Sequence, residues 1–159
     1  MNNEALGYRA SIGALIVNNK KEFLLGKLVG IQDNEHDFIK GGMHGDEEDQ
    51  QTLARELQEE LGDAFMYTVL EESHWYVMYN WSKELQVKKG FRGQARKSYW
   101  VYYDGGAIHL DAEELESYRW VPETELLDVM LESHYPEFLT KVLLHEWEDI
   151  KKKHADLWE

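Results

Sequence analysis

The chain has 159 residues and a formal net charge of −14, from 31 acidic and 17 basic residues. This acidity argues against a general nucleic-acid-binding surface, which would be basic, so no DNA partner is expected. The absence of cysteine excludes disulfides and thiolate metal sites and is typical of a cytoplasmic protein.

The length is that of one domain, covering residues 1–159. The first residues lack the basic region and long apolar run of a signal peptide. No apolar run reaches the roughly 18–20 residues that a membrane span needs, so no membrane association is predicted.

Hydrophobic patterning predicts strands over residues 8–17 and 22–27, joined by a polar turn, and a short strand over 36–39. Further strands are expected over 73–81, 98–103 and 118–121, and helices over 46–61, 123–131 and 136–153. The polar, basic residues 82–96 are predicted to form a loop. Strands interleaved with helices predict an α/β fold, a mixed β-sheet sandwiched between helices in an α/β/α arrangement.

The first of these helices follows a glycine loop. Asp46 is the expected N-cap, and Gly62 is a natural stop because glycine tolerates the left-handed conformation at a helix end. Leu53, Leu57 and Leu61 recur every four residues, so they should form one apolar stripe that faces the core.

An acidic face accompanies the stripe. Glu56, Glu59 and Glu60 stand at i, i+3 and i+4, and Arg55 precedes Glu59 by four residues, so the two can pair. Like-charged neighbours repel by about 0.2–0.5 kcal/mol each in a helix. A hard divalent cation such as Mg²⁺ would offset that repulsion, whereas the alternative interpretation is a solvated face of an acidic protein.

The wider spacing resembles a known signature. Gly41, five residues, Glu47, seven residues and then Arg55-Glu56-Leu57-x-Glu59-Glu60-x-Gly62 is similar to the Nudix box of the Nudix hydrolases. The resemblance implies the Nudix fold. Two departures flank the box: Asp63 replaces an aliphatic residue, and Ile39-Lys40 replaces the Pro-Gly or Pro-Gln that often precedes the first glycine.

Segments outside the box resemble one subgroup of that family. They are Gly7-Tyr8-Arg9, Gly93-Gln94 and residues 114–121, and they are similar to bacterial RNA 5′-pyrophosphohydrolases and dinucleoside polyphosphate hydrolases. The SHYPE segment at 133–137 lacks the basic residues that the RNA enzymes have near their last helix.

The resemblance assigns roles to single residues. It implies a catalytic role for Glu59, as metal ligand or general base, and a supporting role for Arg55, which orients a carboxylate. Metal ligation is implied for the four carboxylates and one carbonyl of Glu56, Glu59, Glu60, Glu114 and Lys40, with Mg²⁺ or Mn²⁺ as the cofactor. Substrate contacts are expected from Arg9, Lys27 and Tyr135, and motif positions are Gly41, Glu47 and Gly62.

The leading hypothesis is metal-dependent hydrolysis of a phosphoanhydride bond in a nucleoside polyphosphate, with a dinucleoside polyphosphate as the best single substrate. RNA 5′-pyrophosphohydrolysis is the alternative, less favoured because of the negative charge. Two other classes are a non-catalytic, nucleotide-sensing Nudix domain and an acidic interaction domain without a ligand. Ligand-induced stabilisation followed by a phosphate-release assay would separate them.

Overall fold

The computed structural model describes residues 6–30, 36–130 and 136–159. Its strands are β1 (Tyr8–Val17), β2 (Glu22–Leu28), β3 (Ile39–Gly42), β4 (Met66–Asn80), β5 (Gly93–Gly105) and β6 (Leu115–Pro122). Its helices are α1 (Asp49–Leu61), α2 (Lys83–Lys89), α3 (Leu126–Val129), α4 (Pro136–Lys141), the π-helical η1 (Val142–Trp147), α5 (Glu148–Lys153) and the 3₁₀ turn η2 (Ala155–Leu157).

The described strands form one mixed sheet in the order β4-β5-β1-β2-β6. β1 is parallel to β5 along its whole length. On its other edge β1 changes partner: residues 11–14 pair with β3, whereas Val17 pairs with Phe23 of β2. The sheet therefore opens between β1 and β2, and β3 lies in that opening with the glycine loop that follows it.

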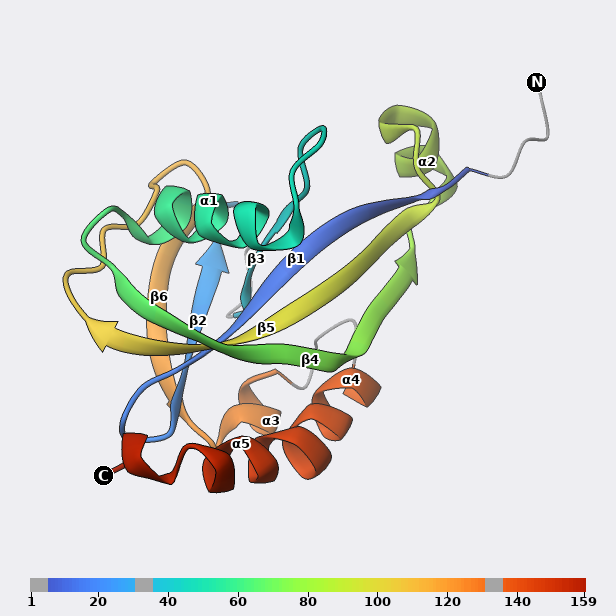
Figure 1. Ribbon diagram of the computed structural model, residues 1–159. Coiled ribbons are helices and arrows are strands. Elements are labelled where there is room, and N and C mark those ends of the chain that lie inside the picture. The colour runs from blue at the N-terminus through green and yellow to red at the C-terminus, as the bar shows by residue number, and fades with distance from the viewer. Residues whose placement is uncertain (1–5, 31–35, 131–135) are drawn as a thin grey trace.

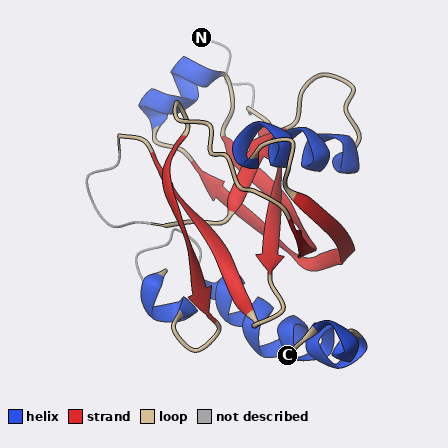
Figure 2. Ribbon diagram, turned by 90° about the vertical axis from the view of Figure 1, so that its left-hand side faces the viewer, coloured by secondary structure: helices blue, strands red, loops and turns tan. Residues whose placement is uncertain are grey.

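Helices cover both faces of the sheet, as predicted. Figure 1 shows α1 along one face and α3, α4 and α5 along the other, and the turned view of Figure 2 separates the same layers. Leu53, Leu57 and Leu61 are buried on the α1 side with Ile12 and Ile16 of β1. The opposite core combines aliphatic side chains with the aromatic rings of Phe23, Trp100 and Trp147, and its two indole rings stack at 5.5 Å.

The predicted bounds of α1 and the short strand were wrong at one end. The helix begins at Asp49 with Glu48 as N-cap, not at Asp46, because a turn closed by Glu47 N–H and the His44 carbonyl (3.0 Å) occupies residues 44–47. Gly62 ends the helix at φ +91°, as expected for a glycine stop. The strand predicted over 36–39 lies at Ile39–Gly42, since β1 offers its partners there.

The loop predicted over residues 82–96 was also wrong. Ser82 caps α2 by accepting the Leu85 N–H at 3.3 Å, and Gly90 ends it in the left-handed conformation at φ +76°. β5 then begins at Gly93. The polar composition concealed this helix because α2 buries none of its residues.

The remaining predictions differ mainly in length. β4 starts at Met66, well before the predicted strand over 73–81, and α3 is limited to four residues of the predicted 123–131. The last helix begins at Pro136 and ends at Lys153 as predicted, although a π-helical turn interrupts it. None of the helices in the described part of the chain has the length and apolarity needed to cross a bilayer.

Candidate functional site

The orientation of α1 decides where its carboxylates lie. Burying one leucine contributes about 1.5–3 kcal/mol, so three buried leucines outweigh the repulsion between neighbouring glutamates. The stripe faces the core, and the same rotation carries Glu56 and Glu60 inward until each is only 8% exposed. Glu59 lies further round the helix, with its side chain 51% exposed.

The glycine loop is fitted to these carboxylates. A Cβ atom on Gly41 would lie 1.9 Å from the Glu56 carboxyl carbon, so only glycine leaves room for that carboxylate against the backbone. A Cβ on Gly42 would lie 2.2 Å from the Arg9 guanidinium. Because Gly41 and Gly42 have no side chains, the Glu56 carboxylate and the Arg9 guanidinium can lie against the backbone of β3.

Arg55 ties the loop to the helix. Its guanidinium donates to both Glu47 oxygens (2.7 and 3.0 Å), to Glu56 (2.8 Å), to Glu59 (3.2 Å) and to the Gly42 carbonyl (2.8 Å). These bonds lower the pKa of Glu47 to about 2, Arg55 being the largest cause and the His44 N–H the next. The predicted Arg55–Glu59 pair is thus one bond of a larger network.

Glu60 meets other acidic groups. Burial is the largest cause of its raised pKa, and the carboxylates of Glu114, Glu56, Asp111 and Glu59 add to it, so that the value is about 7. Burial also raises the pKa of Glu56, against the opposing effect of Arg55. Glu60 and Glu114 line a cavity of about 70 Å³ together with Lys40 and Asp37. The fold thus brings Glu114 to α1 from more than fifty residues away in sequence.

The carboxylates gather without forming a ready-made ligand set. Within residues 6–30, 36–130 and 136–159, no three His, Asp or Glu side chains converge closely enough to hold a cation. Arg55 instead forms ion pairs with Glu47, Glu56 and Glu59. The donor chemistry still suits a hard cation, because hard divalent ions take carboxylate oxygens and four other acidic groups act on the buried Glu60.

The other predicted site residues fall in different surroundings. The Lys40 ammonium pairs with Asp37, and both residues line the small cavity. Lys27 forms an ion pair with Glu116 at 3.4 Å, and its role as a substrate contact stays a prediction. Tyr135 lies outside the described residues.

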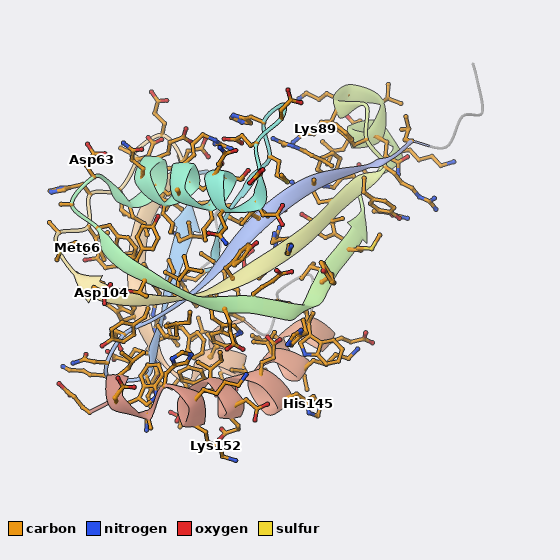
Figure 3. All side chains as sticks on the ribbon, viewed as in Figure 1. Asp63, Met66, Lys89, Asp104, His145 and Lys152 are labelled. Atoms are coloured by element: carbon orange, nitrogen blue, oxygen red, sulfur yellow. The ribbon has the colours of Figure 1, made fainter. Side chains whose placement is uncertain are left out.

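A second, larger cavity of about 650 Å³ adjoins the glycine loop. Arg9, Met43 and Gly45 line one side, and Lys89 and Phe91 line the other. Figure 3 labels Lys89 on α2, beside the loop that joins β3 to α1. From the sequence, Lys89 belongs to the one basic cluster that could meet phosphates, although that cluster was expected to be a solvated loop, and Phe91 had no assigned role. The Lys-Lys-Gly-Phe run, with glycine directly after two basic residues, is a helix-end signal.

Three comparisons relate this site to known proteins. The family model described as NUDIX domain matches residues 7–142. The RNA pyrophosphohydrolase of Rickettsia prowazekii (strain Madrid E) is 27% identical over 133 residues, covering 79% of this chain and 82% of that protein.

The similar solved structures share the fold. A binary complex of the C. elegans Ap4A hydrolase superposes with a TM-score of 0.68 at 16% identity, covering 91% of this chain and 98% of that one. A NUDIX hydrolase from Nitrosomonas europaea gives a TM-score of 0.57 at 18% identity, covering 95% and 91%.

Proposed function

We propose that this chain, which belongs to the NUDIX family, is a hydrolase that cleaves a phosphoanhydride bond in a nucleoside polyphosphate. The single observation that carries the proposal is the acidic cluster at the glycine loop. Glu56 and Glu60 are buried side by side on α1, and the distant Glu114 raises the pKa of Glu60. A protein that needed only solubility would leave these carboxylates in water, where they are not costly.

We propose Mg²⁺ or Mn²⁺ as the cofactor, held by Glu56, Glu60, Glu59 and Glu114 and by the Lys40 carbonyl. A bound divalent ion neutralises phosphoryl oxygens and lowers the pKa of a coordinated water. The residues fit such an ion in two respects: Gly41 leaves a cradle for the Glu56 carboxylate, and Glu60 lies among like charges that a cation would relieve.

Residues of the chain then position the substrate and take a proton from the attacking water. Glu59 is half-exposed, and Arg55 at 3.2 Å is the one side chain among the described residues that bonds to it, so it can turn to take a proton from water. Arg55 orients Glu56 and Glu59 from one side, and Arg9 offers its guanidinium to a phosphate on the other. This division of roles is suited to phosphoryl transfer, where positioning and electrostatics dominate catalysis.

A dinucleoside polyphosphate is the substrate we propose. It supplies a polyphosphate for the cations and two bases for the aromatic side chains, while adding little negative charge to a chain of net charge −14. The relatives named RNA pyrophosphohydrolase favour a 5′-triphosphorylated RNA as the second candidate. We further propose that residues 1–159 form one catalytic domain that acts in the cytoplasm.

Removal of the ligand charges tests this function. Glu56→Gln and Glu60→Gln should each lower divalent-dependent kcat for diadenosine tetraphosphate by about 100-fold or more, while circular dichroism shows an intact fold. Glu114→Ala should raise the metal concentration needed for half-maximal activity. Wild-type kcat in either glutamine variant at saturating Mg²⁺ would refute the metal assignment. Ligand-induced stabilisation of the wild type without phosphate release would instead indicate a nucleotide sensor.

A further inference from the structure

The helix α2 contributes nothing to the hydrophobic core. None of its residues is buried, and Val87 is 78% exposed. A helix of seven residues is too short to be stable on its own propensity, so tertiary anchors must hold it in place. Lys89, at the end of α2, and Phe91, just after it, form one wall of the large cavity.

Backbone anchors fix Phe91 in that wall. The Gly90 N–H donates to the Gln86 carbonyl at 2.8 Å, and the Arg92 N–H donates to the Gly7 carbonyl at 2.8 Å. The Trp81 N–H then donates to the Arg92 carbonyl at 2.9 Å. These bonds fix the backbone on both sides of Phe91, and 38% of its surface is exposed where it lines the cavity, so part of the side chain is accessible to a ligand.

The cavity also holds two cations for which the described part of the chain provides no carboxylate partner. Among the described residues neither Arg9 nor Lys89 forms an ion pair, although acidic residues outnumber basic ones 31 to 17. The Lys89 ammonium lies 4.9 Å from the ring centroid of Trp81, a contact that orients the cation and leaves its charge uncompensated.

Arg9 lines this cavity and also reaches the glycine loop. Its guanidinium lies over Gly42, whereas the Glu56 carboxylate lies over the adjacent Gly41 and on the other face of β3, because successive residues of a strand point to opposite faces. A polyphosphate with its reacting bond at the carboxylates must therefore pass the end of β3 to enter the cavity, which Met43 and Gly45 of the following loop line together with Arg9, Lys89 and Phe91.

From these contacts we infer that the cavity binds the second nucleoside of a dinucleoside polyphosphate, with its base against Phe91 and its phosphates near Arg9 and Lys89. The inference rests on the proposed function and adds the residues that select the substrate. A volume of about 650 Å³ is sufficient for a nucleoside, because small-molecule pockets span roughly 300–1,000 Å³. Phe91 and Lys89 are specificity residues in this assignment, since they lie away from the reacting bond.

The sharpest experiment compares diadenosine tetraphosphate with adenosine 5′-tetraphosphate. The two share the phosphate chain and differ in the second nucleoside. Phe91→Ala should raise KM for the dinucleotide about tenfold, since stacking of one base is worth roughly 1–3 kcal/mol, and should leave KM for the mononucleotide within about twofold. Val87→Ala, on the same helix but outside the cavity, is the matched control.

The lysine pair tests the phosphate contact. Lys89→Gln should raise KM for both tetraphosphates by about threefold or more. Lys88→Gln changes the neighbouring residue outside the cavity, and it should change neither KM beyond a general charge effect. Equal effects of the two lysine substitutions would overturn the assignment of Lys89.

The outcomes separate this inference from the proposed function. If the wild type cleaves neither compound, the proposed function fails. The cavity is then still tested by binding: the dissociation constants of both compounds are measured for Glu59→Gln and for Glu59→Gln combined with Phe91→Ala. If the wild type cleaves them but Phe91→Ala affects both equally, the cavity assignment fails and the function stands. A loss confined to 5′-triphosphorylated RNA, with diadenosine tetraphosphate unaffected, would also overturn the inference and assign the cavity to RNA.

Discussion

At the scale of single residues, Arg55 resolves a conflict within the acidic face. Glu56 is buried, and an ionised buried carboxylate is stable only with a partner. Arg55 donates one hydrogen bond to Glu56 and two to Glu47, so its planar guanidinium pairs with both carboxylates. For Glu60, burial and then the acidic groups Glu114, Glu56, Asp111 and Glu59 are the largest causes of a raised pKa.

That difference predicts how the metal-free protein responds to pH. The pKa of Glu60 is about 7 in the folded state against 4.5 normally. Below pH 4.5 the group is protonated in both states and has no effect. As pH rises from 4.5 through 7, only the unfolded state releases the proton freely, so the free energy of unfolding should fall by about 3 kcal/mol in sum.

Urea denaturation in a chelator at pH 5 and pH 8 measures this effect. Glu60→Gln should lose most of the wild-type decrease between the two values, whereas Glu84→Gln, on exposed α2, should retain it. The same decrease in wild type and Glu60→Gln would exclude Glu60 as its source. Saturating Mg²⁺ should restore stability to the wild type at pH 8, because a cation that binds only the folded state stabilises it.

At the scale of elements, the glycine loop is shaped by the helix behind it. Gly41→Ala would place a Cβ 1.9 Å from the Glu56 carboxyl carbon, and that flexible side chain can swing away while the backbone stays. We therefore expect a folded protein whose kcat falls about tenfold or more, because the carboxylate leaves its position. Gly7→Ala, which meets no atom within 4 Å, is the control. Full activity in Gly41→Ala would show that the position of Glu56 is not critical.

The C-terminal helix depends on one buried carboxylate. Glu146, in the π-helical η1, accepts hydrogen bonds from Ser73 Oγ (2.7 Å), the His74 N–H (2.6 Å) and Trp100 Nε1 (3.0 Å). Ser73 and His74 lie where the pairing of β4 with β5 is irregular. The π-helical turn and this irregular stretch therefore meet at Glu146, and they hold the last helix against the sheet.

Glu146→Gln should reveal that dependence as lost stability. The amide presents N–H groups to donors that need an acceptor, so the free energy of unfolding should fall by about 1–3 kcal/mol. Asp149→Asn, an exposed neighbour on α5, should change it little. Urea denaturation of the three proteins measures the difference, and a stability of Glu146→Gln equal to that of the wild type would mean that the bonds to Glu146 contribute no net stability.

Elements with a hydrophobic period could be predicted from the sequence. Elements and bounds that depend on hydrogen bonds or tertiary contacts could not. β1, β2 and the buried stripe of α1 follow from local hydrophobic spacing. The start of α1 depends on the turn at 44–47 and on the bonds of Arg55 to Glu47, and hydrophobic periodicity does not record such hydrogen bonds. The acidic cluster could be assigned only through the family resemblance, because Glu114 reaches Glu60 through tertiary structure.

At the scale of the whole molecule, charge is unevenly distributed. The net charge is −14, yet α2 and its exit carry Lys83, Lys88, Lys89 and Arg92 against the single acid Glu84. Figure 1 shows α2 beside the start of β1, apart from the two helical layers. A short polyphosphate can use these cations locally, whereas a long polyanion must also approach the acidic remainder.

This distribution predicts the substrate preference. At about 150 mM salt, kcat/KM for diadenosine tetraphosphate should exceed that for a short 5′-triphosphorylated RNA, measured with one metal in one buffer. The dinucleotide has fewer charges and a second base for the cavity at Phe91, while the RNA adds a phosphate with each nucleotide. Repulsion between like-charged partners slows association most at low salt. The RNA value should therefore rise as salt is increased from low concentration, and the dinucleotide value should change less. A clear preference for the RNA at physiological salt would contradict this prediction and would make the 5′ end of RNA the substrate of this site.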